Sequence, residues 1–256
     1  MVQPQLSLHV LAGIPLVEPG DNLIDLLVQS LELTGLSLQP GDVLVIAQKI
    51  ISKSENRYAY LDEVEPSSEA VMLAIECDKD PRQMELVLRE SRCVLRRRQG
   101  VVIVEHRNGY VHANAGIDKS NIQSDEQRPR VLLLPEQPDN SAKRLREGLQ
   151  TRTGIAPHII INDSAGRAWR NGTLGFALGT AGFEAVENRI GEPDLFGREL
   201  EITEVAVADE LAAAASFLMG QAAEAAPVVL IRGAHLRASE QGSESLIRDP
   251  AKDMFR

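Results

Sequence analysis

The sequence predicts an α+β protein with mixed sheets and flanking helices, and three observations support this prediction. Short apolar runs recur along the 256 residues, while other segments carry apolar residues at helical spacing. The two kinds of segment do not alternate strictly, as they would around a parallel α/β sheet. Aromatic residues make up only 4% of the chain, so we expect a core of Leu, Val, Ile and Ala.

The first elements are expected to be a strand, a helix and a buried strand. Residues 6–11 alternate weakly and predict a strand, which is followed by a loop rich in Gly and Pro. Asp21 is a good N-cap for a helix over 23–33, where apolar residues recur at helical spacing. The continuous apolar run 43–47 predicts a strand that is buried on both faces.

The middle of the chain is expected to add two helices, over 67–75 and 81–91, and short strands at 94–95, 101–105, 110–113 and 131–134. The arginine run 96–98 is interpreted as a charged turn between the first two of these strands. Asn108-Gly109 is a strong hairpin signal, and it predicts that the strand before it pairs with the strand after it.

The C-terminal part is expected to contain two helices and three strands. Either Asp139 or Ser141 is expected to cap a helix that ends near Gly154. An alanine-rich helix over 209–219 is expected to stop at Gly220. Apolar runs predict the strands at 159–161, 200–207 and 228–231.

Charge and cysteine content limit the classes of partner. Asp and Glu number 37 against 27 for Lys and Arg, and the net charge of −10 offers no general attraction for nucleic acid or an anionic membrane. A small anionic ligand would need a local cationic site. Cys77 and Cys93 form no CxxC motif, which excludes a thiolate zinc site. No apolar run approaches the roughly 20 residues of a membrane helix, and the start shows no signal-peptide pattern, so we expect a cytoplasmic protein.

Common motifs are absent, since the chain has no GxxxxGK(S/T), GxGxxG, HExxH or GxSxG, and its five histidines are scattered. The first unusual segment is 112–121, where small residues precede Asp118 and Asn121. A carboxylate such as Asp118 can hold a hard cation, and Asn121 can hydrogen-bond a base or a phosphate. The alternative is a polar turn after a hairpin.

A second segment combines carboxylate, hydroxyl and cationic side chains at the expected end of strand 159–161. Asp163 and Ser164 offer the oxygen ligands that Mg(II) and Mn(II) prefer. Arg167 and Arg170 lie three residues apart, with the single tryptophan between them, and such a pair can clamp a phosphate or a carboxylate. The alternative is an Asx turn followed by solvated arginines.

Two further segments carry weaker signals. Gln48, Lys49 and Lys53 follow the buried strand 43–47. Lysines four residues apart share one face of a helical turn, where they either supply local positive charge to a site or form a solvated face. Gln221 follows the expected helix stop, either near a ligand or as part of the stop itself.

Nine segments in one order resemble the coenzyme F420-0:L-glutamate ligase family, the non-ribosomal glutamyl ligases of deazaflavin cofactor synthesis. Each segment alone is a weak signal, but the ordered set is specific and runs from Gly13 almost to the C-terminus. The matching stretches are Gly13-Ile-Pro-Leu, Gly41-Asp-Val, Ile51-Ser-Lys, Asn114-Ala-Gly-Ile-Asp, Asp163-Ser-Ala-Gly-Arg-Ala-Trp-Arg, Asp194-Leu-Phe-Gly-Arg, Val207-Ala-Asp-Glu-Leu-Ala, Met219-Gly and Ile231-Arg-Gly.

The resemblance implies a GTP-dependent ligase that adds L-glutamate to the phospholactyl carboxylate of coenzyme F420-0 through an acyl phosphate. It implies Mn(II) or Mg(II), sometimes with K+, and a homodimer. It also implies one family unit over 1–256 with two intertwined lobes, the main lobe formed by about 1–90 plus 190–256 and the second by about 91–189.

The resemblance also assigns residues. Arg167 and Arg170 are the expected catalytic side chains, and the expected metal ligands are Asp118, Asp163, Ser164 and Gln221. The residues expected to line the nucleotide site are Ile14, Pro15, Leu16, Val17, Gln48, Lys49, Lys53, Asn121, Met219, Gly220 and Ala222.

Some positions depart from the family pattern. Ser164 replaces a threonine common in relatives and keeps its hydroxyl, and Gln221 stands where some members have Glu. Ala165 and Ala168 replace the Phe and Pro of many archaeal members. Two alternatives stay open: a metal-dependent glutamyl ligase that acts on another acidic acceptor, and a nucleotide- or deazaflavin-binding homologue with weak catalysis, for which Gln221 is the only support.

Overall fold

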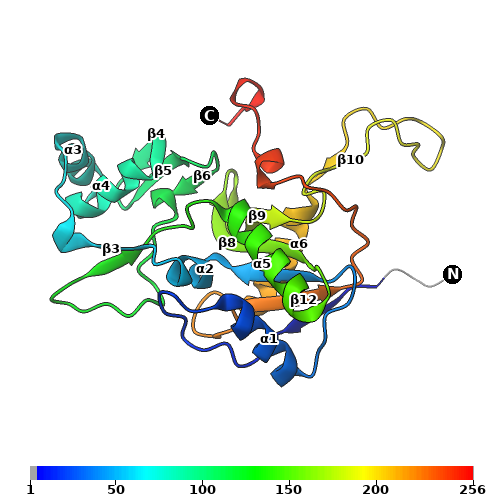
Figure 1. Cartoon of the computed structure of the whole chain (residues 1–256). Helices are drawn as coiled ribbons and strands as arrows, with labels where there is room; N and C mark the ends of the chain where they lie inside the picture. The colour runs from blue at the N-terminus through cyan, green and yellow to red at the C-terminus, as the bar shows by residue number, and fades with distance from the viewer. Residues whose placement is uncertain (1–4, 256) are drawn as a thin grey trace.

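The computed structural model describes residues 5–255 and contains both helices and mixed sheets, which confirms the predicted α+β class (Figure 1). Residues 1–4 and Arg256 lie outside the described residues, and so does the prediction about a signal peptide that rests on the first four. Between residues 5 and 255, no helix combines the length and the apolar composition that crossing a bilayer requires.

The elements follow one another along the chain as strands, α-helices and short 3-10 turns. The strands are β1 (Ser7–Val10), β2 (Val43–Ala47), β3 (Tyr58–Tyr60), β4 (Ser91–Arg98), β5 (Val101–His106), β6 (Val111–Ala113), β7 (Arg130–Leu132), β8 (His158–Arg167), β9 (Arg170–Ala181), β10 (Glu187–Asn188), β11 (Glu204–Val205) and β12 (Val228–Arg232). The α-helices are α1 (Leu23–Thr34), α2 (Gln48–Ser54), α3 (Ser68–Cys77), α4 (Pro81–Arg89), α5 (Pro138–Thr153) and α6 (Val207–Met219).

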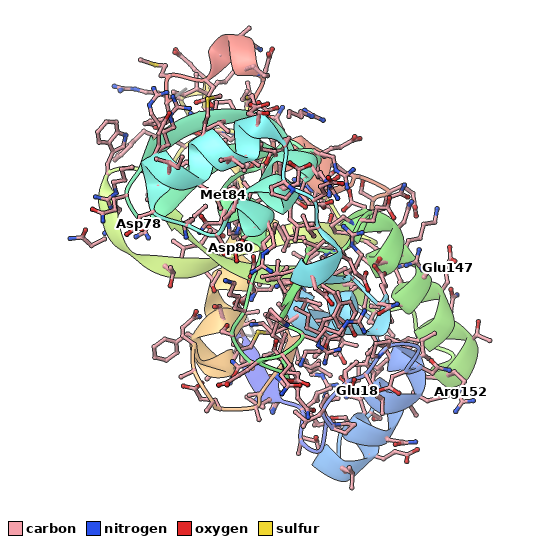
Figure 2. The ribbon with its side chains drawn as sticks, turned by 90° about the vertical axis from the view of Figure 1, so that its left-hand side faces the viewer. Glu18, Asp78, Asp80, Met84, Glu147 and Arg152 are labelled. Carbon is pink, nitrogen blue, oxygen red and sulfur yellow. The ribbon has the colours of Figure 1, made fainter. Side chains whose placement is uncertain are left out.

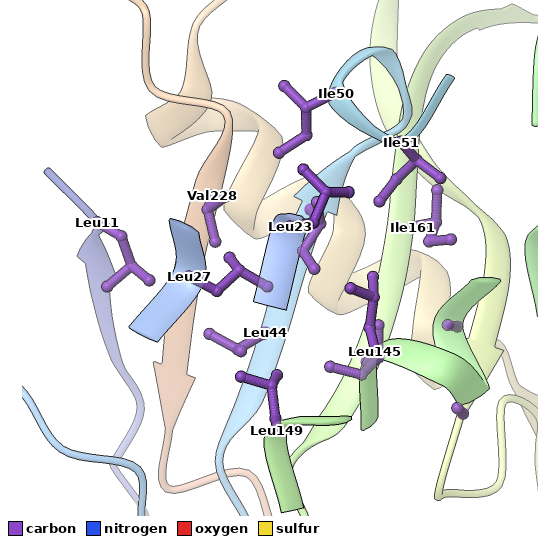
Figure 3. Packing of buried hydrophobic residues seen from close by; sticks show 14 of the residues in the cluster. Leu11, Leu23, Leu27, Leu44, Ile50, Ile51, Leu145, Leu149, Ile161 and Val228 are labelled. Carbon is purple, nitrogen blue, oxygen red and sulfur yellow. The ribbon is translucent and has the colours of Figure 1, made fainter. Parts of the chain in front are cut away.

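The main sheet has five strands in the order β1-β12-β2-β8-β9, of which only β2 and β8 run parallel. Alternate residues of β2 face opposite sides of the sheet. Leu44 and Ile46 pack with α1 and α5, whereas Val43 and Val45 pack with α6. Figure 3 shows the first of these faces, with Leu44 among side chains of α1 and α5. Because helices cover both faces, residues 43–46 are fully buried, as the continuous apolar run predicts.

The parallel pair β2 and β8 brings distant segments to one edge of the sheet. Ala47 lies opposite Asn162, so α2 begins beside Asp163. Strand β12 starts at the same edge, where the Ala47 N–H donates to the Pro227 carbonyl at 2.8 Å. The register of β8 against β9 shifts between Ile161 and Asn162, and a bulge of this kind changes where the following side chains point.

A second hydrophobic core cluster lies beside the main sheet, among α3, α4 and the strands of the β4-β5-β6 and β3-β7 sheets. In Figure 2, Met84 lies in this part of the molecule, whereas Glu147 and Arg152 lie on α5 at the opposite end. The buried members of this cluster run from Leu61 to Leu133. Strands β8 and β9, which follow in the chain, belong to the main sheet instead, because β8 pairs with β2. The expected lobe boundaries, with about 91–189 in the second lobe, stay a prediction.

Three predicted details of the helices and turns are wrong. Asn22 caps α1, while Asp21 accepts from the Glu18 N–H at 2.8 Å. Neither Asp139 nor Ser141 caps α5, which begins after Gln137; Asp139 accepts from the Thr180 N–H at 2.7 Å and so ties the helix to β9. The arginine run 96–98 lies inside β4 rather than in a turn, because all three residues pair with residues of β5.

Two predicted strands also differ in length. Strand β8 continues to Arg167 instead of ending at residue 161, because β9 supplies partners along the whole hairpin. The strand expected over 200–207 is reduced to Glu204–Val205, and α6 already begins at Val207. The segment between β10 and β11, drawn in yellow in Figure 1, projects away from the main sheet.

Candidate functional site

A cavity of about 390 Å³ lies at the sheet edge where β2, β8 and the start of β12 meet. Every residue that the sequence analysis expected to bind nucleotide or metal lines this cavity, although these residues come from five separate segments. Those segments are 14–17, 48–53, 118–121, 163–164 and 219–222. The structure therefore brings them together, while the role of each residue stays a prediction.

Helix α2 places two lysines on the cavity wall, because residues four apart share one helix face. Lys53 is only 9% exposed, and its Nζ donates to the Asn121 carbonyl at 2.9 Å. Burial, followed by the positive charge of Lys49, lowers the pKa of Lys53. Two ammonium groups on one wall of the cavity produce a positive potential on an otherwise acidic chain, and a bound anion would relieve their repulsion.

Asp118 is held by its own loop and by Lys49. Its Oδ1 accepts from the Ser120 N–H at 2.7 Å, and its Oδ2 accepts from Lys49 Nζ at 2.6 Å and from the Ser120 hydroxyl at 3.0 Å. The Asp118 backbone forms a pair of hydrogen bonds with Leu132, at 3.0 and 2.9 Å. Burial works to raise the pKa of the Asp118 carboxyl, but the hydrogen bonds from Lys49 and Ser120 outweigh it and lower that pKa. Asp118 therefore favours its ionised form, with the ammonium group of Lys49 against it.

Asp163 is held by a histidine from a different sheet. Nε2 of His112, on β6, lies 3.1 Å from Asp163 Oδ2, and Nδ1 lies 3.0 Å from the Ala113 carbonyl. The His112 side chain is only 8% exposed, and its ring lies 5.6 Å from that of Phe176. Burial works to lower the pKa of His112, but the hydrogen bond and charge of Asp163 outweigh it and raise that pKa. Within residues 5–255, Asp163 Oδ1 has no hydrogen-bond partner.

The donor set of the cavity fits a small divalent cation. Asp118 and Asp163 offer carboxylates, Ser164 a hydroxyl and Gln221 an amide oxygen, and Mg(II) and Mn(II) prefer such oxygen ligands while keeping water or phosphate oxygens. Asn162, which also lines the cavity, has a buried Oδ1 without a partner among the described residues. No group of three or more His, Cys, Asp or Glu side chains in the described part could hold a metal alone. A cation here would be held by the two carboxylates together with the neutral oxygens of Ser164 and Gln221.

The segment after α6 lines the cavity and is tied to the Asp118 loop. Gly220, at the end of the helix, has a φ of 73°, which turns the chain sharply. Asn121 Nδ2 donates to the Ala222 carbonyl at 2.8 Å, so two segments 101 residues apart hold one another. Gln221 Nε2 donates to Ser216 Oγ at 3.1 Å, which leaves the amide oxygen of Gln221 to serve as a ligand.

The structure does not bring Arg167 and Arg170 into this cavity. The two residues face one another at the far end of the β8–β9 hairpin, and neither lines the cavity. Trp169 lies between them with a φ of 66° and is 86% exposed. The expected catalytic role of the two arginines stays a prediction that this single chain does not test.

Sequence reasoning missed several side chains at the site. His112 was interpreted as one of five scattered histidines, because nothing near it in sequence indicates that β6 packs beside β8. Ser120 lies in the segment 112–121 and Asn162 directly precedes Asp163, but neither shows a spacing that singles it out. Ser216 carries no signal beyond its position one turn before the end of α6.

The fold and the cavity define an α+β protein whose site, with lysines beside oxygen donors, suits small anions of high charge. The chain matches the family model described as F420-0:Gamma-glutamyl ligase over residues 13–233. It is similar to the coenzyme F420:L-glutamate ligase of Methanothermobacter thermautotrophicus, with 44% identity over 98% of this chain and 99% of the relative. The protein of that name from Methanocaldococcus jannaschii is 40% identical, over 100% of both chains. That from Archaeoglobus fulgidus is 38% identical, over 95% of this chain and 94% of its own length. The chain therefore belongs to the F420-0:gamma-glutamyl ligase family, as its ordered motifs indicate.

Proposed function

We propose that the protein is a GTP-dependent ligase that joins L-glutamate to the phospholactyl carboxylate of coenzyme F420-0. The similar archaeal proteins carry the name coenzyme F420:L-glutamate ligase, which supports the acceptor and the amino acid. One structural observation carries the proposal: Lys49, Lys53, Asp118 and Asp163, from distant segments, line a single cavity.

The reaction needs an activated carboxylate, because an unmodified carboxylate would have to expel oxide. Transfer of the γ-phosphoryl group of GTP to a carboxylate oxygen of the acceptor forms an acyl phosphate and releases GDP. The glutamate amine then attacks the acyl carbon, phosphate leaves with the electron pair of the C–O bond, and the nitrogen loses a proton to give the amide. All three substrates are anionic, so the protein contributes mainly by positioning them and offsetting their charge.

The cavity residues divide between these tasks. Lys49 and Lys53 bind phosphate oxygens of the nucleotide, and the 14–17 and 219–222 segments surround the rest of it. Asp118, Asp163, Ser164 and Gln221 would hold Mn(II) or Mg(II), with K+ as a further cation. When bound there, the divalent cations would neutralise phosphate charge and align the nucleotide with the acceptor. Lys49 has to leave Asp118 Oδ2 for this, and its flexible side chain can turn toward the phosphates instead.

Mass spectrometry tests the proposal directly. The purified protein, incubated with GTP, Mn(II), L-glutamate and coenzyme F420-0, should convert the acceptor into products heavier by one or more glutamyl units, with stoichiometric GDP. ATP in place of GTP and a panel of acidic acceptors in place of coenzyme F420-0 measure the nucleotide and acceptor preference. No mass increment with any nucleotide or divalent cation would contradict the proposed reaction.

Arg167 and Arg170 are proposed to support the acceptor rather than the nucleotide, because they lie on the strand pair that carries Asp163 but outside the cavity. Replacement of Arg170 by Ala should lower turnover while leaving GDP affinity unchanged, measured by calorimetry on the same preparation. Unchanged turnover would remove Arg170 from the reaction.

Gln221 favours one other candidate function, a homologue that binds nucleotide but turns over slowly. A neutral amide oxygen attracts a second cation less than a carboxylate does. In that case wild-type protein should bind GDP without measurable ligation, and Gln221→Glu should restore turnover.

A homodimer is also proposed. The segment between β10 and β11 exposes Leu195, Phe196 and Ile202 almost completely, and exposed large apolar side chains in one segment favour a protein contact. Light scattering of the full chain should give a mass of two copies, and Phe196→Asp should shift it toward one.

A further inference from the structure

We propose that His112 is a positioning residue for Asp163. It fixes the carboxylate in the orientation used for cation binding and joins it to the chain segment that carries Asp118. This inference rests on the proposed metal-dependent function, and it gives a role to a side chain that its sequence context leaves without one.

The contacts of the imidazole are directional and not only apolar. Nε2 of His112 lies 3.1 Å from Asp163 Oδ2, and a carboxylate oxygen can only accept, so this hydrogen bond needs a proton on Nε2. The contact occupies Oδ2 and leaves Oδ1 without a partner among residues 5–255. A carboxylate held through one oxygen cannot rotate freely, and its other oxygen stays available for a ligand. Outer contacts of this type orient metal ligands in proteins generally.

The ring itself is held on two further sides. Its Nδ1 lies 3.0 Å from the Ala113 carbonyl, which also only accepts, so this hydrogen bond needs a proton on Nδ1 as well. The ring lies 5.6 Å from that of Phe176, the residue opposite Asp163 in the β8–β9 pair. His112 therefore belongs to β6 in sequence but packs on β8 and β9 of the main sheet. The donor atom has little freedom to move away from Asp163.

The chain after His112 leads directly to Asp118. Strand β6 ends at Ala113, and a tight turn follows in which Asn114 and Ala115 both have positive φ, 51° and 55°. Asp118 comes next, and its backbone pairs with Leu132. One side chain thus anchors the start of the Asp118 segment to the strand that carries Asp163. We infer that His112 also maintains the spacing of the two carboxylates.

Three substitutions distinguish the hydrogen-bond donor of His112 from the packing of its ring. His112→Phe keeps a ring against Phe176 but removes the donor, and His112→Asn keeps an amide that is too short to reach Asp163. His112→Gln places an amide N–H near the position of Nε2. The matched control is His106→Phe on the neighbouring strand β5, a buried histidine that stacks on Tyr110 and lies near Glu90 instead of Asp163.

The measurement is Mn(II) affinity of the full chain with GDP present, taken from the paramagnetic resonance signal of the free ion. We expect His112→Phe and His112→Asn to bind Mn(II) roughly 10- to 100-fold more weakly, the usual effect of removing such a contact. His112→Gln and His106→Phe should stay within about threefold of wild type. Circular dichroism establishes that each variant is folded, and if the Phe variant is not, the comparison of Asn with Gln decides. A crystal structure of the Asn variant should show a rotated Asp163 carboxylate.

Two results would overturn the role of His112. One is wild-type Mn(II) affinity in both the Phe and the Asn variant; the other is equal weakening by Gln and Phe, which would mean that the ring rather than the donor matters. Absence of Mn(II) binding by wild-type protein would contradict the metal-dependent function and this inference together. Wild-type Mn(II) binding without glutamate ligation would contradict the reaction alone, and the affinities of the variants would still decide the role of His112.

Discussion

Glu90, at the end of α4, and Asp163, in β8, are both carboxylates that meet basic side chains from distant segments, but they differ in how completely they are engaged. Arg107 Nη2 donates to Glu90 Oε1 at 2.8 Å, and Arg57 Nη2 donates to Oε2 at 3.0 Å. Both oxygens of Glu90 are therefore occupied, and its side chain is only 8% exposed. Asp163 is engaged by His112 through Oδ2 alone and lines the cavity.

This difference separates a carboxylate that connects segments of the fold from a carboxylate of the candidate site. Arg57 also donates through Nε to the Leu134 carbonyl at 2.8 Å, so Glu90 and Arg57 connect the end of α4 to the segments that flank β3 and β7. Glu90 does not line the cavity, and a buried carboxylate held by two arginines contributes to stability rather than to ligand binding. Access to the cavity, together with an Oδ1 of Asp163 that has no partner among residues 5–255, distinguishes Asp163 from Glu90.

The largest expected effect is that of Asp163→Asn. We expect glutamyl ligation to fall by at least roughly 1,000-fold, a loss of about 4 kcal/mol in transition-state stabilisation, because a cation would lose a charged ligand. The melting temperature should change little, since the amide can still accept a hydrogen bond from His112. Ligation is measured by mass spectrometry and stability by calorimetry. Turnover within a few-fold of wild type would remove Asp163 from the site.

Glu90→Gln should show the opposite pattern. The substitution leaves Arg57 and Arg107 without a counter-charge, and the loss of one partner of a buried pair costs about 3 kcal/mol of unfolding free energy. Urea unfolding measures this loss, and GDP affinity of the folded protein should be unchanged. A stability equal to that of wild type would mean that the Glu90 ion pairs do not stabilise the fold.

The difference in unfolding free energy between wild type and Glu90→Gln should depend on pH. Burial works to raise the pKa of Glu90, but nearby His106, Arg57 and Arg107 outweigh it and hold that pKa below its ordinary value of 4.5. The folded state therefore favours the carboxylate more than the unfolded state does, so this stabilisation is fully present above pH 4.5 and is lost as the pH falls through the folded pKa. The difference in unfolding free energy between wild type and Glu90→Gln should shrink below pH 4.5. A constant difference from neutral to acidic pH would contradict this assignment.

The smallest effect is expected for Lys49→Met. Loss of one ammonium from the cavity should weaken GTP binding about 10-fold, or roughly 1.4 kcal/mol, because Lys53 still contributes positive charge. Calorimetric titration measures the affinity. Lys143→Met, on an exposed part of α5, is the matched control and should bind GTP like wild type. Equal affinities of the two variants would place Lys49 outside the nucleotide site.

Several elements follow from local sequence alone. The continuous apolar run 43–47 predicts β2, Asn108-Gly109 predicts the β5–β6 hairpin, and Gly220 marks the end of α6. These predictions succeed because hydrophobic periodicity, turn chemistry and glycine conformation act within a few residues. The ordered motifs likewise indicate the family and the segments that line the cavity.

Other features depend on contacts between residues that are far apart in the chain. The length of β8 depends on its pairing with β9, and Asp139 is drawn away from the cap of α5 by the backbone of Thr180. Lys49 meets Asp118 across 69 residues, and His112 meets Asp163 across 51. Sequence by itself determined which carboxylates and lysines were available and the segments that carry them. Only the packing of β6 and α2 against one sheet edge decided which of them touch, because a hydrogen bond depends on a distance that no local pattern records.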